Sequence, residues 1–357
     1  MMTIDELQNL CLGCMNPLPR SVNKCSNCGW IKGQTNDQNH LMPGSILAGK
    51  YLVGKTLGQG GFGITYLGWS TVQNCKVAIK EFFPDVSMVR RDSNRYTVNP
   101  TSDRNIKNLF DGGKQKFFDE SQLLARFDAN PNIVSVIDFF FENNTAYIVM
   151  EFLDGVTLMK YMEKVNRPLE LQELFKILDP VVSALEKVHE QQLLHRDISP
   201  DNIMITSKGS KLLDFGAARA FSLDGHRKNT VFVKFGYAPQ EQFISTGYQG
   251  PWTDEHAFAA TIYHAITGNA PPSLTERVGF STVDTLPAPT SFGIKLTPAQ
   301  ESALMKGMSI DYKDRYPTLT EFYNAFKGNT NQSRGGGAIR NLAASLFGNI
   351  LGIFLDD

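Results

Sequence analysis

The sequence predicts an α+β fold in which strands come first and helices follow, behind a small cysteine-rich module. Short β-rich segments separated by turn residues run from Tyr51 to Glu151. Apolar residues at helical spacing then mark three regions, 171–190, 254–267 and 296–326. Four of the five cysteines lie within the first 28 residues. A chain of 357 residues, 42% of them hydrophobic, is long enough for two or three folding units with a substantial core.

The composition narrows the class of protein. The formal net charge is −1, which argues against a protein that coats nucleic acid, so nucleic acid is not expected as a partner. Residues Met1–Leu10 are polar and acidic and lack the apolar run of a signal peptide. An odd number of cysteines, with Cys75 isolated, does not fit a secreted disulfide framework. A reducing, cytoplasmic compartment is therefore expected.

Four cysteines near the start of the chain have the spacing of a metal site. Cys11 and Cys14 form one C-x2-C pair, Cys25 and Cys28 form a second, and ten residues separate the pairs. Four thiolates at this spacing can converge on one zinc ion, with two disulfides or free thiols as the alternatives. Four protein ligands leave the metal no open position, so we expect structural Zn²⁺ whose loss leaves catalysis intact.

Residues 1–33, which contain these cysteines, resemble a short zinc ribbon. Such a small module is expected to fold only with its metal. Ribbons bind nucleic acid or protein, and nothing in this segment decides between them, so a protein partner of the ribbon stays open. Residues 34–49 are polar and rich in Asn and Gln, and we expect a linker there.

A glycine-rich stretch follows at the start of the strand-like region. Gly58, Gly60 and Gly63 form G-x-G-x-x-G, a pattern that dinucleotide-binding folds also use. Here a β-rich segment rather than a helix comes after it, so the stretch joins two strands. Lys80 arrives 17 residues after Gly63 in another strand-like segment. A loop without side chains can close its backbone over phosphates, and a strand lysine can bind them.

Lys80 needs a carboxylate partner to hold its side chain in place. The next helical segment is expected at residues 116–127, and Glu120 on that helix is the favoured partner. Glu142 and Glu151 are poorer candidates because they lie in or beside predicted strands.

A long insertion, at about residues 84–113, separates Lys80 from that helix. It carries a basic group formed by Arg90, Arg91 and Arg95. A solvated loop is the favoured interpretation of this group, and a docking or regulatory surface is the alternative.

The most specific pattern lies after the strand-like region and its first long helix. Residues His195–Asn202 read His-Arg-Asp-Ile-Ser-Pro-Asp-Asn, and Asp214 opens the triplet Asp-Phe-Gly twelve residues later. Asp197 can accept the proton of a substrate hydroxyl. Asn202 and Asp214 can hold the magnesium ions that neutralise the phosphates of ATP. The ordered pair of motifs at this spacing is a strong functional signal.

In their order and spacing these motifs resemble those of eukaryotic-type (Hanks-type) bacterial Ser/Thr protein kinases, over residues 50–327. The resemblance implies a bilobal protein-kinase fold, with a small β-rich lobe and a larger helical lobe behind the zinc ribbon. A break at Asp154-Gly155 suits the hinge between such lobes. The resemblance also implies ATP and Mg²⁺ or Mn²⁺ as cofactors and proteins as substrates.

The resemblance assigns roles to single residues. Lys80 would pair with Glu120, and Asp197 would position the substrate hydroxyl. Asn202 and Asp214 would bind magnesium. The glycines expected to cover the phosphates are Gly58, Gly60 and Gly63. The positions expected around the adenine are Leu57, Ala78, Met150, Glu151, Leu153 and Met204.

Two further contacts are implied in the helical lobe. Asp254 would brace the catalytic loop, and Glu241 would pair with Arg315 at the base of the lobe. The segment Ala238-Pro239-Gln240-Glu241 departs from the usual A-P-E order because its proline is displaced by one position.

The activation segment, from Phe215 to Glu241, is expected to carry a regulatory phosphate. Arg196 places a cation beside Asp197, and in the family such an arginine often binds a phosphorylated residue. Thr230 is the favoured site and Ser222 the alternative.

A second departure concerns a cation. The residue two after Asp197 is usually lysine in Ser/Thr kinases and is Ser199 here. The position seven residues before Glu241 usually holds threonine and is Lys234 here. The lysine and the hydroxyl have exchanged places, so we expect Lys234 to neutralise the transferred phosphate with Ser199 hydrogen-bonded nearby. The alternative is a Lys234 that faces solvent or the peptide substrate.

The C-terminal end is expected to be separate from the kinase region. Residues 328–337 are rich in Gly, Asn and Ser and form a flexible linker. Residues 338–355 are apolar, with polar and charged residues interspersed, which is marginal for a membrane span. An amphipathic helix that docks on protein or on a membrane surface is favoured, with a short membrane anchor or a disordered tail as alternatives.

Three function classes compete for this sequence. The first is phosphorylation of Ser/Thr hydroxyls on proteins, including autophosphorylation. The second is a pseudokinase scaffold that recruits partners through its zinc ribbon, supported only by the missing lysine at Ser199. The third is a small-molecule kinase, which the recognisable substrate-binding segment up to Glu241 argues against. An active protein kinase is favoured because no magnesium ligand and no ATP lysine is lost.

Overall fold

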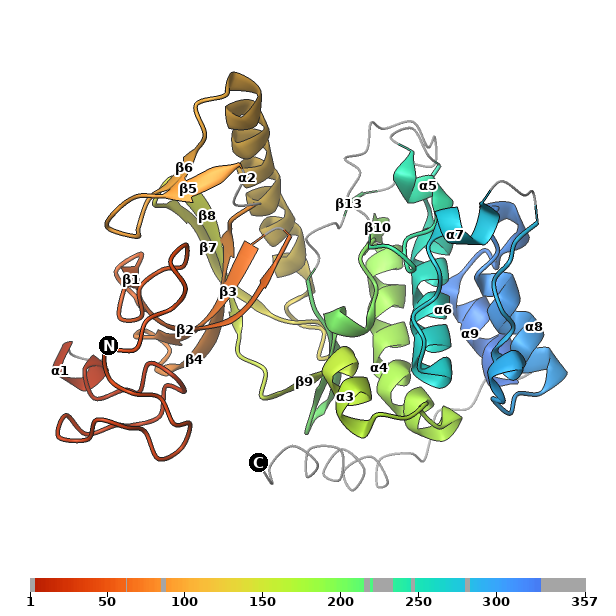
Figure 1. Cartoon of the computed structure of the whole chain (residues 1–357), viewed down its shortest axis with the longest axis horizontal. Coiled ribbons are helices and arrows are strands. Elements are labelled where there is room, and N and C mark those ends of the chain that lie inside the picture. Colours follow the sequence, from red (N-terminus) through yellow and green to blue (C-terminus); the bar gives the residue numbers. More distant parts are fainter. Residues whose placement is uncertain are drawn as a thin grey trace. The chain divides into compact units, whose positions relative to one another are not determined.

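The computed structural model describes residues 4–61, 63–84, 88–214, 219–220, 234–244, 248–279 and 283–328. The chain divides into two compact units. The first unit comprises Met1–Ala129 and Val134–Leu153, and the second comprises Asn130–Ile133 and Asp154–Asp357. Figure 1 shows a strand-rich first unit and a helix-rich second unit. The predicted α+β fold, with β-rich and helical lobes, is confirmed.

The first unit is built on a six-stranded antiparallel sheet of order β1-β2-β3-β4-β8-β7. β-Branched and aromatic residues of the central strands are buried, as Tyr66, Ile79 and Val149 show, each 0% exposed. The strands are β1 (Ile46–Leu47), β2 (Tyr51–Gly60), β3 (Gly63–Ser70), β4 (Cys75–Phe82), β7 (Val136–Glu142) and β8 (Thr145–Glu151).

Helix α2 (Arg104–Leu124) packs on strands β7 and β8 and is followed by a 3-10 turn (Ala125–Phe127). Its start was predicted at residue 116 and lies twelve residues earlier. The pair Gly112-Gly113 interrupts the helical pattern in the sequence. In the structure Phe110, 1% exposed, packs on Phe82 with ring centroids 5.6 Å apart, so tertiary packing extends the helix through both glycines.

The insertion before α2 forms a β-hairpin from β5 (Val89–Arg91) and β6 (Val98–Pro100). The expectation of a solvated basic loop is wrong for two of its three arginines. The Arg91 side chain is 1% exposed and forms an ion pair of 2.6 Å with the buried carboxylate of Glu81. Arg95 donates hydrogen bonds to backbone carbonyl groups of the segment 34–49. Only Arg90 is exposed as expected.

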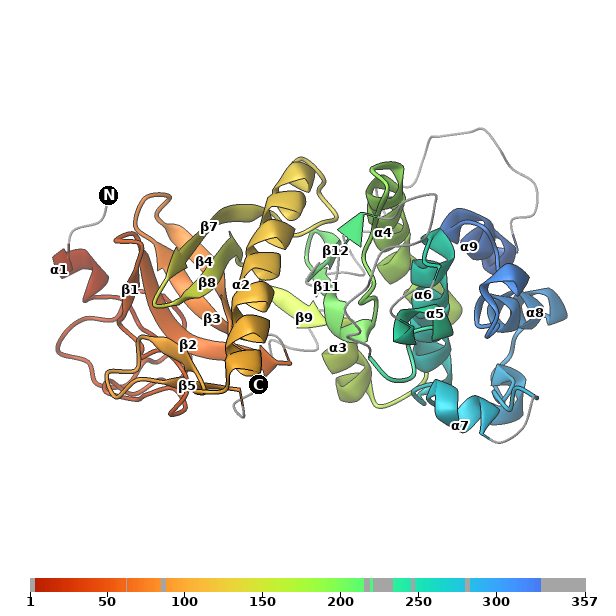
Figure 2. The ribbon, with the colours of Figure 1, turned by 90° about the horizontal axis from the view of Figure 1, so that it is seen from above.

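The second unit has a helical core. Helices α4, α6, α8 and α9 pack against one another (Figures 1 and 2). Nearly every residue of α6 from Thr253 to Thr267 is buried, because neighbours surround it. The helices of the unit are α3 (Leu158–Val165), α4 (Leu171–Glu190), α5 (Gln240–Phe243), α6 (Pro251–Thr267), α7 (Leu274–Val278), α8 (Pro298–Gly307) and α9 (Leu319–Lys327).

Short strands and turns of the second unit carry the motifs for which a catalytic role was predicted. β9 (Gly155–Thr157), β11 (Ile203–Thr206) and β12 (Gly209–Leu212) form a sheet of order β12-β11-β9. A second sheet pairs β10 (Leu193–Leu194) with β13 (Arg219–Ala220). The 3-10 turns are Pro200–Asn202, Pro289–Phe292 and Tyr312–Asp314. At the N-terminus, α1 spans Ile4–Leu7 in the first unit.

Among the described residues, no helix has both the length and the apolarity needed to cross a membrane. The apolar segment 338–355, for which membrane contact was considered, lies outside the described residues. The expected phosphate sites Thr230 and Ser222 also lie outside them.

Candidate functional site

The stretch His195–Asn202 forms a loop between β10 and β11 and gathers the expected acid and amide groups. The Asn202 side-chain amide donates to the Asp197 backbone carbonyl at 2.7 Å and to the Asp197 carboxylate at 2.9 Å. Burial raises the pKa of the Asp197 carboxyl, and the neighbouring Asp214 carboxylate raises it further. The opposing influences on this pKa come from His195, Lys234 and Asn202.

This arrangement suits a divalent cation. Carboxylate and carboxamide oxygens are donors that Mg²⁺ accepts, and the hydrogen bond of 2.8 Å from the Leu213 backbone N–H to the Asn202 carbonyl holds Asn202 beside the segment that carries Asp214. A bound cation would relieve the repulsion between Asp197 and Asp214. The donor set of Asn202 and Asp214 therefore fits the expected metal.

Asp254 on α6 holds the backbone of the catalytic loop through hydrogen bonds. Its carboxylate is 0% exposed and accepts hydrogen bonds from the His195 backbone N–H at 2.8 Å and the Arg196 backbone N–H at 2.7 Å. His189 Nε2 makes a third contact at 2.8 Å. Burial alone would raise the pKa of Asp254, but the interactions with His189, His195 and Arg196 hold it below its usual value. The predicted bracing role is confirmed.

The loop stores backbone strain beside the catalytic carboxylates. Arg196 has a φ of 68° and Asp214 a φ of 50°, both in the left-handed region that residues with side chains rarely adopt. The hydrogen bonds that Asp254 accepts from the His195 and Arg196 backbone N–H groups fix the first of these turns. These two turns lie next to Asp197 and at Asp214, whose carboxylates are close enough to interact electrostatically.

The predicted pair of Glu241 and Arg315 is present at the base of the second unit. The guanidinium donates to both carboxylate oxygens, at 2.7 and 3.2 Å, and both side chains are buried. Thr253 donates a further hydrogen bond of 3.0 Å to Glu241. The displaced proline of this segment therefore does not prevent the ion pair that anchors α5.

Lys234 lies against the catalytic loop. Its Nζ atom donates to Ser199 Oγ at 3.0 Å and forms an ion pair with Asp201. Ser199 is 0% exposed, so the contact is made to a buried residue. The expected contact between the two exchanged residues is present. Asp201 was not anticipated, although its place directly before Asn202 could have indicated it.

In the first unit, the glycine-rich stretch is held open between β2 and β3. A Cβ atom at Gly58 or Gly60 would meet nothing within 4 Å, so there is open space beside the backbone at both positions. Gly63 is different, because a Cβ atom there would lie 2.1 Å from the Glu81 carbonyl oxygen. The strand pairing itself therefore requires glycine at position 63.

The other expected ATP-binding residues of the first unit lie mainly on strands β4 and β8 and on helix α2. Lys80 Nζ is 5.9 Å from the ring centroid of Phe117 on α2, one helical turn before the half-buried Glu120. Ala78 lies directly opposite Met150 in the pairing of β4 and β8. The remaining adenine positions are Leu57, 37% exposed, Glu151 and Leu153 in the first unit and Met204 on β11 in the second.

The two rejected partners of Lys80 are engaged elsewhere. Glu151 accepts a hydrogen bond of 2.8 Å from the Ser135 backbone N–H. Glu142 accepts one of 2.8 Å from the Ala48 backbone N–H. These contacts favour Glu120 as the carboxylate for Lys80.

Comparison with known proteins accounts for this set of residues. Residues 51–288 match the protein kinase domain family. The chain belongs to this family. The match covers the glycine-rich stretch, Lys80, the catalytic loop and Asp214.

Several curated relatives of this kinase are bacterial proteins. The "Probable serine/threonine-protein kinase PknB" of Lactococcus lactis is 28% identical over 299 residues, which are 82% of this chain and 44% of that protein. The "Serine/threonine-protein kinase PrkC" of Bacillus subtilis is 30% identical over 237 residues, 65% of this chain and 32% of that protein. The chain thus spans less than half the length of these relatives.

Solved structures show the same fold. The structure titled "PpkA-294 apo form" is 29% identical in sequence, has a TM-score of 0.68, and matches over 81% of this chain and 100% of that chain. The kinase domain of PknI from Mycobacterium tuberculosis has a TM-score of 0.60 at 23% identity, which shows a likeness of fold.

The four cysteines before the kinase domain converge. Their Sγ atoms all lie within 4.8 Å of one another, and none of the four is in a disulfide. Cys11 and Cys28 have sulfurs 3.6 Å apart, and Cys14 and Cys25 have sulfurs 3.8 Å apart. A zinc ion about 2.3 Å from four tetrahedral sulfurs requires sulfurs about 3.8 Å apart. The cluster therefore has the dimensions of a zinc site.

Backbone amides stabilise thiolates in this cluster. Burial would raise the pKa of Cys25, but the backbone N–H groups of Asn27 and Cys28 donate to its sulfur and lower the pKa to about 7. Burial raises the pKa of Cys11 to about 12, with the amides of Gly13 and Cys14 opposing the shift. A cation among the four sulfurs would favour the thiolate form of each.

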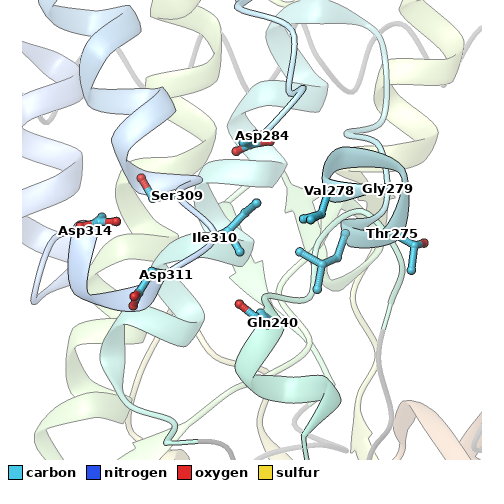
Figure 3. A pocket seen from close by; sticks show the side chains of 10 residues that line it. Gln240, Thr275, Val278, Gly279, Asp284, Ser309, Ile310, Asp311 and Asp314 are labelled. Carbon is cyan, nitrogen blue, oxygen red and sulfur yellow. The ribbon is translucent and has the colours of Figure 1, made fainter. Parts of the chain in front are cut away.

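A cavity of about 920 Å³ in the second unit is not part of these sites. Figure 3 shows apolar side chains, among them Val278 and Ile310, with carboxylates around them. Arg277 pairs with Asp284 at 2.5 Å and so neutralises one carboxylate. The lining residues are Gln240, Leu274, Thr275, Val278, Gly279, Asp284, Ser309, Ile310, Asp311 and Asp314. None of them is an expected ATP, magnesium or zinc ligand.

Proposed function

We propose that this kinase transfers the γ-phosphoryl group of ATP to Ser/Thr hydroxyls of proteins, including its own activation segment. The observation that carries the proposal is the catalytic loop, in which Asp197, Asn202 and Asp214 are brought together and braced by Asp254. Bacterial relatives named as Ser/Thr protein kinases support the substrate class.

In this proposal Asn202 and Asp214 hold Mg²⁺ or Mn²⁺, which neutralises the charge of the ATP phosphates when bound. Asp197 accepts the proton of the substrate hydroxyl as the oxygen attacks the γ-phosphorus. Burial, the main cause of its raised pKa, makes Asp197 a better proton acceptor than an exposed carboxylate. Phosphoryl transfer demands little covalent chemistry of the protein, so positioning and charge neutralisation supply most of the rate.

In the first unit, Lys80 binds the phosphates and Glu120 holds Lys80 in place. The open backbone at Gly58 and Gly60 admits the phosphates. The family pattern assigns contacts with the adenine to Leu57, Ala78, Met150 and Met204, and hydrogen bonds with it to the backbone near Glu151 and Leu153. These assignments rest on the family pattern and on the placement of each residue on its strand.

The scaffold alternative has less support. It rests on the absence of the usual lysine at position 199, and Lys234 places an ammonium group 3.0 Å from the Ser199 hydroxyl. The charge that the family supplies from the catalytic loop is therefore supplied from the activation segment.

Labelled ATP with magnesium and a generic protein substrate tests the proposal. Wild type should label the substrate and itself, whereas Asp214→Ala should label neither above background. Asp128→Ala, at an exposed position of the first unit, should match wild type. A wild-type protein that binds ATP but labels no protein would favour the scaffold.

We also propose that Thr230, with Ser222 as the alternative, is autophosphorylated and binds Arg196. A phosphate adds charge that arginine can pair with, which would order the segment that delivers Lys234. Mass spectrometry of active enzyme should find the phosphate at Thr230. Fully active protein with an unmodified Thr230 would contradict this assignment.

The cysteine cluster is proposed to hold one structural Zn²⁺ through Cys11, Cys14, Cys25 and Cys28. The distances among the four sulfurs support it. With four protein ligands, the ion would stabilise the module and take no part in phosphoryl transfer.

A further inference from the structure

The outer edge of β2, which leads into the glycine-rich stretch, is completed by residues that precede the kinase domain. β1 pairs only with Tyr51 and Leu52. On the other side, the pairing of β2 with β3 has register shifts between Val53 and Thr56 and between Thr56 and Gly58. The strand is therefore weakly paired just before its glycines.

Three backbone amides of β2 at this place donate to the preceding segments. The acceptors are the carbonyl of Ser45 for Val53 (2.8 Å), the carbonyl of Leu12 for Lys55 (2.8 Å) and the side chain of Asn36 for Thr56 (3.0 Å). Residues 36–45, which we call the strap, thus replace an edge strand although they contain no regular element. The segment predicted to be a linker is therefore hydrogen-bonded to the sheet.

His40 of the strap reaches the glycine-rich stretch itself. Its Nε2 atom is 3.0 Å from Gln59 Oε1, and its Nδ1 atom is 2.9 Å from Thr56 Oγ1. The amide oxygen of Gln59 can only accept, so Nε2 carries a proton, and Nδ1 accepts from the Thr56 hydroxyl. One neutral tautomer of a side chain that is 4% exposed therefore satisfies both contacts.

The insertion hairpin and the sheet hold the strap in place from the other side. Arg95 donates to the carbonyls of His40 and Asn36 at 2.9 and 3.0 Å. Tyr66 accepts from the Leu41 backbone N–H at 3.1 Å. The Tyr66 hydroxyl in turn donates to Glu81, the buried partner of Arg91. The strap, for which the sequence predicted only a linker, is thus held between the sheet and the insertion hairpin.

We propose that the strap positions the glycine-rich stretch. Through its contacts with Gln59 and Thr56, His40 holds this stretch in the conformation that binds ATP. The inference rests on the proposed function, because it assumes that this stretch binds the phosphates. Gly58 and Gly60 have no side chains, so the backbone between them has many conformations to lose when ATP binds. Contacts that fix Gln59 between these glycines before binding reduce that loss.

The variant His40→Ala, in the full-length protein, tests the inference. The variant Arg95→Ala tests whether the hydrogen bonds that hold the strap are needed as well. We expect the Kd for a non-hydrolysable ATP analogue, and the KM for ATP, to rise roughly tenfold in both variants. The kcat should stay within about twofold of wild type, because Asp197 and its partners are unchanged. His40→Gln keeps a donor for Gln59 and should recover most of the affinity. Arg90→Ala, at the exposed arginine of the same hairpin, should match wild type.

A second variant separates positioning from folding. Gln59→Ala removes the contact from the other side without touching the strap, so it should weaken nucleotide binding to a similar extent. Adding His40→Ala to it should cost little more, because both changes remove one interaction. A His40→Ala protein that folds and binds the analogue as wild type does would overturn the inference, as would an equal loss in Arg90→Ala. A wild-type protein that binds no nucleotide would instead overturn the proposed function.

Discussion

The Lys234 side chain connects the activation segment with the catalytic loop. Its ammonium group contacts Ser199 and Asp201, and it opposes the rise in the pKa of Asp197. A cation at this place can neutralise the charge of a phosphoryl group in transfer. Because it belongs to the activation segment, that neutralisation requires the segment to be in place.

We therefore predict that Lys234→Ala lowers kcat about a hundredfold, which corresponds to about 3 kcal/mol of transition-state stabilisation. The double swap Ser199→Lys with Lys234→Thr should recover much of that loss, because it restores the usual arrangement of the family. Lys208→Ala, at an exposed lysine in the turn after β11, is the control for lost charge. Steady-state kinetics in which Lys234→Ala stays within twofold of wild type would exclude the role.

Glu255 on α6 gives a prediction about pH. It is 0% exposed, and burial raises the pKa of its carboxyl to about 9, with the Arg315 charge opposing the shift. Between the ordinary value of 4.5 and this value, the folded protein keeps a proton that the unfolded chain has lost. The carboxyl therefore lowers the free energy of unfolding as the pH rises.

Glu255→Gln removes this penalty. Relative to wild type, the variant should gain up to about 1.4 kcal/mol of stability for each pH unit between 5 and 8. Chemical denaturation at several pH values measures the difference. Glu163→Gln, at an exposed position on α3, should show no such slope. Parallel pH profiles for wild type and Glu255→Gln would contradict the assignment.

At the level of single residues, the sequence predicted the contacts that belong to a motif. The contacts of Asp254 with the catalytic loop and of Glu241 with Arg315, which the family resemblance implied, are both present. His40 was missed because a histidine in a polar segment has no pattern of its own. Arg91 was misjudged because its partner, Glu81, is recognisable as buried only once the sheet is formed.

Helix α2 shows why element boundaries were harder to predict than the elements themselves. The glycine pair disfavours a helix locally, and the packing of Phe110 on Phe82 outweighs it. The two glycines also differ in their surroundings. A Cβ atom at Gly112 would meet nothing within 4 Å, whereas one at Gly113 would lie 2.8 Å from the ring of Phe82.

This difference predicts opposite outcomes for neighbouring substitutions. Gly112→Ala should stabilise the protein by up to about 1 kcal/mol, because alanine loses less backbone entropy in a helix. Gly113→Ala gains the same propensity but forces the Phe82 ring to move, so it should be destabilising relative to Gly112→Ala by about 1 kcal/mol or more. Chemical denaturation of the two variants decides, and equal effects would show that the ring moves without cost.

At the scale of the whole molecule, the α+β fold and the order of strands and helices followed from periodicity and motifs. The contribution of the N-terminal module to the kinase sheet did not follow from them. Leu10 and Met15 pack with Leu52 and Leu67 in one buried cluster. A Cβ atom at Gly54 would lie 2.5 Å from both the Leu12 carbonyl and Met15 Cε, so module and strand touch closely. Sequence alone contains no sign of such a contact.

This contact changes the expected consequence of losing the metal. The four cysteines lie far from the ATP motifs in the sequence, and we therefore predicted that loss of the metal would leave kinase activity unaffected. In the structure, Leu12 lies between Cys11 and Cys14, and its carbonyl accepts the Lys55 amide at the irregular part of β2. If zinc fixes the turn that contains Leu12, its removal should loosen β2 as well as the module.

We predict one zinc ion per chain. Removing it with a chelator, or replacing two ligands in the double variant Cys11→Ser with Cys14→Ser, should lower the melting temperature. Either change should also weaken binding of an ATP analogue roughly tenfold, the same loss that is expected for His40→Ala. Cys75→Ser, at the isolated cysteine, should change neither. Metal analysis, thermal unfolding and analogue binding measure the three quantities on the same samples. Protein without zinc whose four thiols titrate freely would refute the metal site. Zinc loss that lowers the melting temperature but leaves analogue affinity unchanged would instead confine the metal to the module and separate it from β2.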